Sequence, residues 1–361
     1  MGVAPGLRPL RDPVEAGASR ATPERLPGRL PLAAWLGAAL LALALFASFL
    51  ALAWSTGDLV EFLASERRWW EHRDARLVVL ITIAVAYLPL AHRTVARGAQ
   101  RNLAALRDAL DWGPEGFDAA LERAPRASRR ASSLAGALGI LCVPLTAMLV
   151  DRDLGLYFRH GYWGAAQVWE FAIGSALGWS LARLAYAITL DGRRFSALAS
   201  GLHEVDLLDT GGLAPFARQG LLAALPGLIL LSFLAFNLGD RGWLWATGVL
   251  GSPALAWTLV SVRLPMRGLH ARLRRAKAAE LAQVNAAIRG DAAALEQTAI
   301  AQRAREVGLS DLIAYRTLVE AVPEWPLERA LRARLVLYVA LPLGSWLGGA
   351  LVERLLEATL G

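Results

Sequence analysis

The stretch LAAWLGAALLALALFASFLALAW, residues 32–54, contains 23 residues and no charged side chain. A helix needs about 20 apolar residues to cross the hydrocarbon core of a bilayer, within a range of about 17–25. The apolar core of a cleaved signal peptide is shorter, at about 7–15 residues. We therefore predict that residues 32–54 form a transmembrane helix that is retained in the mature protein.

The same pattern recurs along the chain, which has a hydrophobic fraction of 55% and a mean hydropathy of +0.39. Six further blocks are nearly free of charge: Leu77–Ala91, Ala131–Val150, Tyr162–Ala182, Gln219–Leu238, Gly242–Val262 and Leu335–Val352. The block Leu77–Ala91 is short and spans only if Arg76 and Arg93 extend toward the two headgroup layers. The predicted fold class is all-α, a membrane bundle of about seven transmembrane helices with amphipathic helical connectors.

Arginine placement predicts the orientation of the bundle. If the N-terminus is cytoplasmic and all seven blocks span, the cytoplasmic segments hold 29 basic residues and the outer segments hold 8, with Arg183 at a boundary. Cytoplasmic loops of membrane proteins carry an excess of Lys and Arg. The composition, with Lys277 as the single lysine, is typical of a GC-rich bacterial genome. We therefore expect a bacterial inner-membrane protein with its N-terminus in the cytoplasm and its C-terminus outside.

The blocks divide the chain into four parts. Residues 1–30 are rich in Pro, Gly and Arg and are expected to form a disordered cytoplasmic tail. Residues 31–263 hold six membrane helices and their connectors. Residues 264–332 form a cytoplasmic pair of amphipathic helices, and residues 333–361 hold the seventh transmembrane helix with a short outer tail.

The cytoplasmic pair is predicted from two apolar seams. Leu269, Leu273 and Val284 recur at helical spacing in a helix that continues from the sixth block. A second amphipathic stretch covers residues 309–322, with Ser310 as its expected N-cap. The two helices are expected either to fold on each other or to meet a second copy as a coiled coil, and the heptads are too few to choose between these.

Two groups of smaller signals concern packing. Small residues spaced four apart, such as Ala135 with Gly139 and Gly174 with Gly178, predict close approach of helix backbones. Residues 59–70 have the pattern of an amphipathic helix on the outer surface or against the bundle rim. The similar spacing of Leu103 and Leu106 to that of Phe195 and Leu198 raises the hypothesis of an internal repeat.

The candidate functional residues within the membrane are Glu170 and Arg183. A carboxylate in a membrane helix costs a few kcal/mol on insertion scales, so such residues often serve function. The two residues are 13 positions apart, which is about 20 Å along a helix, so we do not expect them to pair. Glu170 could reach the outer headgroup layer or a water pocket, and Arg183 could extend to the inner face.

Other chemistry has little support. His203 and Asp206 could share one face of a helix and bind a metal, although the neighbouring leucines better fit an amphipathic connector. Cys142 is a lone cysteine in an apolar block, and the sequence contains no P-loop, GxGxxG or HExxH motif. The basic residues form no stripe with interleaved aromatics, so we expect no nucleic-acid binding, no cofactor and no metal.

The function is therefore expected to be non-enzymatic. The first hypothesis is a scaffold, sensor or regulatory component whose cytoplasmic helices bind a protein partner or a second copy in a homo-oligomer. The alternative is a channel or transporter for an uncharged or lipophilic solute, lined by Glu170 and small polar residues. The third is an intramembrane enzyme, which would require His203, Asp206 or Glu170 to converge in one pocket.

Overall fold

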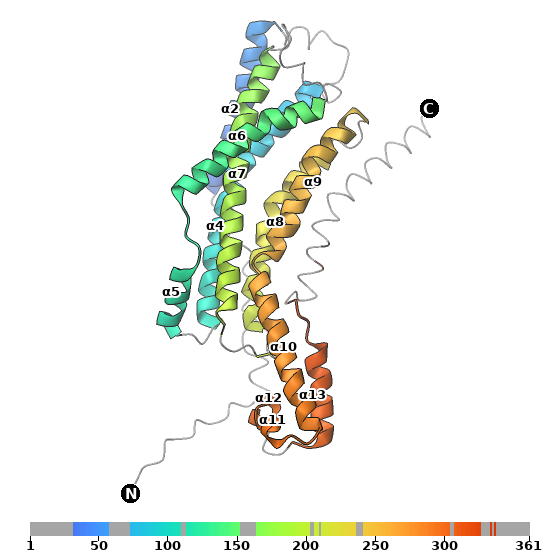
Figure 1. Ribbon diagram of the computed structural model, residues 1–361. Helices are drawn as coiled ribbons and strands as arrows, with labels where there is room; N and C mark the ends of the chain where they lie inside the picture. The colour runs from blue at the N-terminus through green and yellow to red at the C-terminus, as the bar shows by residue number, and fades with distance from the viewer. Residues whose placement is uncertain are drawn as a thin grey trace.

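The computed structural model describes residues 32–57, 73–109, 113–151, 164–202, 206–208, 211–235, 241–303 and 307–325, together with positions 333 and 336. Every regular element in these ranges is helical (Figure 1), which confirms the all-α prediction for them. The elements are α2 (Leu32–Thr56), α4 (Arg73–Ala109), α5 (Gly113–Arg123), α6 (Arg129–Asp151), α7 (Ala165–Ser200), the 3-10 turn η3 (Gly211–Leu213), α8 (Ala214–Ala235), α9 (Arg241–Arg263), α10 (Arg267–Ile288), α11 (Ala292–Glu296), α12 (Ala299–Arg303) and α13 (Leu309–Ala321).

Some predictions concern residues outside these ranges. They are the tail 1–30, the amphipathic helix over 59–70 and, apart from positions 333 and 336, the seventh membrane helix within 333–361.

Four of the described helices are long and apolar enough to cross a membrane: Leu32–Thr56, Ala75–Arg107, Gln167–Ser200 and Gly211–Leu234. A fifth span results if the segments Gly248–Arg263 and Arg267–Ile288, which meet at 47°, count as one. Only 6% of the apolar window of α2 is buried, against 44% for α8. The periphery of the bundle is thus apolar, as it must be where lipid replaces water.

α6 covers the predicted third block and has two different faces. Its outward face carries a stripe of exposed leucines at helical spacing: Leu134, Leu138, Leu141 and Leu145, which are 57–66% exposed. An exposed apolar stripe of this length on an aqueous surface would be an association site. Lipid contact is the setting in which such a stripe is stable, and this supports a membrane location for α6.

The other face of α6 packs against α7 through glycines. A Cβ at Gly139 would collide with the backbone carbonyl of Gly178, and one at Gly178 would lie 2.5 Å from the oxygen of Gly139. The spacing of small residues in the sequence predicted this close approach, and the structure confirms it.

The helix that contains the second predicted block, Leu77–Ala91, extends well beyond it. α4 has Pro89 inside it and ends at Ala109, as one helix of 37 residues. No turn signal interrupts residues 92–109 except Gly98, and Gly98 serves packing because a Cβ there would collide with Leu222 of α8. At 1.5 Å per residue, α4 is about 55 Å long, so it exceeds a hydrocarbon core of about 30 Å.

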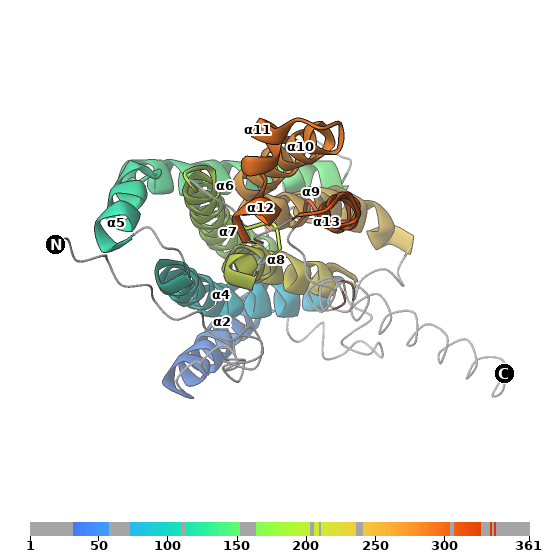
Figure 2. The ribbon, with the colours of Figure 1, turned by 90° about the horizontal axis from the view of Figure 1, so that it is seen from below.

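The larger of the two described buried clusters lies at the end of the bundle opposite α2. Viewed from that end, α7 lies between α4 and α10 (Figure 2), and it packs against both. Phe195 of α7 and Phe216 of α8 are fully buried there and meet edge to face, with ring centroids 6.0 Å apart. Leu106 of α4 and Leu269 of α10 belong to the same cluster. This core joins the bundle to the helices that follow α9.

α10 and α13 form an antiparallel pair that closes on itself (Figure 1). The turn between α10 and α11 uses Gly290 at φ +97°, a conformation that favours glycine. Asp291 then caps α11, since its carboxylate accepts from the Ala294 N–H at 3.1 Å. Of the two arrangements predicted for the amphipathic helices, the structure has the intramolecular one.

The prediction that Ser310 is the N-cap of α13 is wrong. Ser310 was expected to cap the helix, but the N-cap residue is Gly308 and the helix begins at Leu309. Asp311 takes the capping role, because its carboxylate accepts from the Gly308 N–H at 3.0 Å. An acidic side chain in the first turn also interacts favourably with the helix dipole.

We predict that Gly178→Ala destabilises the protein, because the new methyl group must separate α6 from α7. Over-packing of this kind costs about 1–3 kcal/mol. The measurement is the melting temperature of the purified full chain in detergent. Gly174→Ala, one turn earlier on α7, is the matched control, since a Cβ there lies at an ordinary 3.6 Å from Val143. Equal melting temperatures for the two variants would contradict the close contact.

Candidate functional site

Glu170 lies on α7 beside a clamp between α7 and α2. The clamp is formed by Trp169, which is 5% exposed and donates its indole N–H to the Ser48 hydroxyl at 2.9 Å. The ring of Phe49 meets Trp169 edge to face, with centroids 5.6 Å apart. Glu170 itself is half-buried. The backbone that carries the candidate carboxylate is therefore fixed by its neighbour.

Arg183, the second predicted residue, is exposed at the other end of the apolar part of α7. Its Nε donates to the Ser132 hydroxyl of α6 at 3.2 Å, and its guanidinium lies 5.7 Å from the ring centroid of Trp179. Both contacts are suited to a basic side chain at a helix boundary. Glu170 and Arg183 lie on one continuous helix 13 residues apart, and the structure does not bring them together.

The small polar residues proposed to line a solute path are largely occupied within their own helices. Three of them donate their hydroxyls to the carbonyl four residues earlier at 2.7–2.9 Å: Thr146, Ser175 and Ser232. A hydroxyl that is bonded in this way satisfies its donor locally. Asn237, a further candidate, lies outside the described residues.

The predicted metal-binding pair, His203 and Asp206, was expected on one face of a helix, but Asp206, the described member, is not helical. α7 ends at Ser200 with Gly201 as its C-cap, and Asp206 follows in an irregular segment. The Asp206 carboxylate accepts from the Leu208 N–H at 2.9 Å, as in an Asx turn. His203 lies outside the described ranges, within which no group of three or more metal-ligating side chains gathers.

The structure shows a polar network that the sequence analysis missed. Glu280 of α10 accepts from two groups with one oxygen: the Ala299 N–H at the start of α12, at 2.8 Å, and the buried Tyr315 hydroxyl of α13, at 2.9 Å. Glu280 is the only acidic residue in α10. We call α10, α11, α12 and α13 together the docked lobe, since this carboxylate ties three of its helices together.

A second set of polar contacts closes the far end of α13. Lys277 donates to the carbonyls of Glu320 at 2.7 Å and Val322 at 2.9 Å, where the helix leaves acceptors free. The ring nitrogen Nδ1 of His270 lies 3.0 Å from the carbonyl oxygen of Glu324, and its ring stacks on Trp325 at 4.3 Å. The one available sequence signal was that Lys277 is the single lysine of the chain.

The docked lobe is continuous with the bundle. Leu269, Leu273 and Tyr315 belong to the same buried cluster as Phe195 and Phe216. At Gly268, α10 approaches α7 so closely that a Cβ would collide with the carbonyl oxygen of Ser196. Because the backbones are in contact here, α10 cannot move toward α7 without displacing it.

We predict that the Trp169–Ser48 hydrogen bond couples α7 to α2 beside Glu170. Ser48→Ala and Trp169→Phe should each lower the free energy of unfolding, and a hydrogen bond of this kind contributes about 1 kcal/mol. The double variant should cost less than the sum of the two single variants, since both remove one interaction. The measurement is chemical unfolding of the full chain in detergent. Strict additivity would contradict the coupling.

Comparison of the chain with protein-family models, with curated proteins and with solved structures found no match. Function must therefore be argued from the geometry of the described helices. Those helices form an all-helical protein with four to five segments that are able to span a membrane.

Proposed function

We propose that the chain is a non-enzymatic scaffold, sensor or regulatory component of the membrane that acts through the docked lobe. The observation that carries this proposal is the shared core between the lobe and the membrane helices, together with the backbone contact at Gly268. A tethered domain would move independently of the bundle. A lobe that shares its core with the bundle moves with it, so a change in either one affects the other, as a sensor or a regulator requires.

The proposal includes the finer topology inferred from the sequence. The bundle has about seven membrane helices in a bacterial inner membrane, with the N-terminus and the docked lobe in the cytoplasm and the C-terminus outside. The arginine distribution supports this orientation. The charged first half of α10 follows directly after the apolar α9, in agreement with it.

The surface that would contact a partner is the outward face of α13. Leu309 and Ile313 lie one turn apart on that face and are 59% and 52% exposed. About a third of a turn around the helix, Leu312, Tyr315 and Val319 are buried. Tyr315 and Val319 belong to the same buried cluster as Leu269 and Leu273 of α10. An amphipathic helix with apolar residues on its outward face is suited to helix-to-helix contact with a protein partner or a second copy of the chain.

The alternative, a channel or transporter for an uncharged solute, has less support. It needs polar groups that face a path through the bundle, and the hydroxyls of Thr146, Ser175 and Ser232 are bonded to their own helices. Glu170 and Ser180, which are half-buried, remain as polar candidates among the described residues. We therefore keep the scaffold, sensor or regulator as the proposal.

We predict that a cysteine at position 313 forms covalent adducts in native membranes. The variant Ile313→Cys is made in a Cys142→Ser background, labelled with a short thiol-reactive photocrosslinker such as benzophenone maleimide, which needs no lysine on the second protein, and irradiated. The products are examined by electrophoresis and mass spectrometry. An adduct with a second copy or with one reproducible protein is expected.

The matched control is Ala279→Cys, an exposed position on α10 of the same lobe. It should give no such adduct, since it lies away from the apolar face of α13. No adduct at position 313, or equal labelling at both positions, would contradict the proposal.

A further inference from the structure

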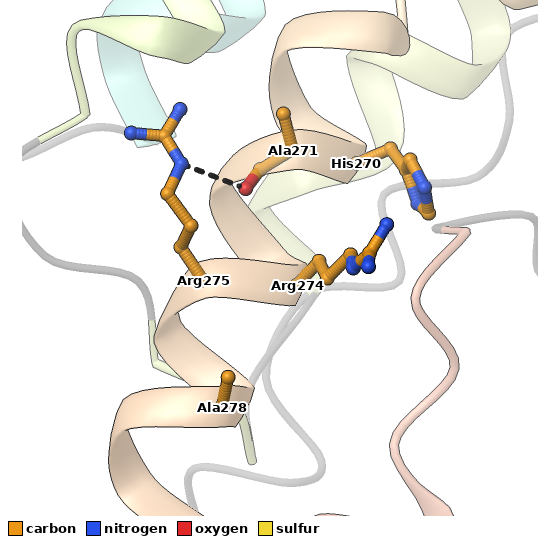
Figure 3. A pocket seen from close by; sticks show the side chains of 5 residues that line it. All are labelled: His270, Ala271, Arg274, Arg275 and Ala278. Atoms are coloured by element: carbon orange, nitrogen blue, oxygen red, sulfur yellow. Dashed lines mark hydrogen bonds between the residues drawn. The ribbon is translucent and has the colours of Figure 1, made fainter.

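α10 carries a shallow depression on the side of the docked lobe that is nearest to the bundle. Its volume is about 350 Å³. Five residues spaced along one face of the helix line it (Figure 3): His270, Ala271, Arg274, Arg275 and Ala278. Three of the five, His270 and the two arginines, carry polar nitrogen atoms, and the small side chains of the two alanines leave open space beside them.

The two arginines of this depression are available to bind an anion. Both are exposed, and within the described part of the chain neither has a carboxylate partner. The Arg275 Nε donates to the Ala271 carbonyl at 3.2 Å, which fixes the side chain and leaves its terminal nitrogens as donors. Guanidinium groups with free donors match the geometry of phosphate oxygens.

The charge that α10 contributes along the depression is of one sign, while Glu324 lies at the rim with its backbone carbonyl 3.0 Å from His270 Nδ1. Residues 267–277 of α10 contain five Arg and Lys side chains and no acidic one. Glu280, the nearest acid on the helix, already accepts from the Ala299 N–H and the Tyr315 hydroxyl. An anion that enters the depression therefore meets attraction without a competing carboxylate of α10.

The depression lies between the ends of two apolar blocks that the sequence predicts to cross the membrane. The apolar block of α9 ends at Val262, eight residues before His270. On the other rim, Trp325 stacks on His270 and is 37% exposed, ten residues before the predicted block Leu335–Val352. A tryptophan beside basic side chains is typical of the headgroup layer, where its apolar ring and N–H are both satisfied.

We propose that this depression binds the phosphate of an anionic phospholipid headgroup. Clusters of four to eight basic residues next to a transmembrane helix bind anionic lipid. The open shape favours a headgroup that the bilayer presents at high local concentration over a small soluble anion, which needs an enclosing site. This inference does not depend on partner binding through α13.

The test uses the purified full chain in uncharged detergent, titrated with phosphatidylglycerol, phosphatidylcholine or inorganic phosphate and followed by native mass spectrometry. The unaltered protein should bind phosphatidylglycerol at least about tenfold more tightly than phosphatidylcholine. Arg274→Gln combined with Arg275→Gln should weaken phosphatidylglycerol binding about thirtyfold and leave phosphatidylcholine unchanged, in line with the contribution of two basic residues at an anionic surface.

The matched control removes two charges elsewhere on the docked lobe, with Arg289→Gln combined with Arg316→Gln. Both positions are exposed, and the exposed ion pair of Arg316 with Glu320 contributes little to stability. Unchanged phosphatidylglycerol binding in this control supports the site. Equal weakening in both double variants, or wild-type binding in the first, would overturn it. Displacement of the lipid by inorganic phosphate at equal concentration would also overturn it, in favour of a soluble-anion site.

Discussion

The thickness of the bilayer is the constraint on which this architecture depends. α4 and α7 have 37 and 36 residues, so each is about 55 Å long, whereas a hydrocarbon core measures about 30 Å. Both helices must project from the membrane by several turns. Their projecting ends carry apolar side chains such as Leu106 and Phe195, and exposure of these side chains to water would be unfavourable. The docked lobe and α8 cover these side chains, and this explains why most residues of the larger buried cluster lie outside the apolar blocks.

Within the membrane the same helices obey a different rule. There is no hydrophobic driving force between helices in lipid, so association depends on close packing. The contact of Gly139 with Gly178 between α6 and α7, and that of Gly220 with the Val262 carbonyl between α8 and α9, are of this kind. The leucine stripe on the outer face of α6 is left for the lipid chains. α6 thus packs closely against α7 on the face that carries small residues, and it presents leucines to lipid on the other face.

Much of the fold could be predicted because hydropathy and residue size act locally. The apolar block at 32–54 and the described part of the block at 219–238 lie on α2 and α8, and the spacing of Gly174 and Gly178 marked the contact with α6. Helix ends were harder, because they depend on competition between neighbours. At α13 the N-cap is Gly308, bonded to the Asp311 side chain, in place of the predicted Ser310. α4 continues past Ala91 because no residue there ends the helix. About seven spans were predicted, and the described residues support four to five.

The candidate site was less predictable than the fold. Glu170 and Arg183 stood out as charges in apolar surroundings, but a charge does not reveal what lies across the helix interface. The links made by Glu280 and Lys277 join residues 19 to 45 positions apart, and periodicity within one helix carries no information about such pairs. His270 and Trp325 are 55 positions apart in the sequence, and only the folded chain brings their rings together.

The bend of 47° between α9 and α10 has a mechanical consequence. α10 has 22 residues, so it forms an arm of about 33 Å set at an angle to the membrane helix that carries it. A rotation of α9 by about 10° around its own axis would sweep the tip of that arm sideways by about 4 Å. A straight continuation would only spin in place. The bend at residues 264–266 therefore converts rotation of α9 about its axis into lateral displacement of the far end of α10.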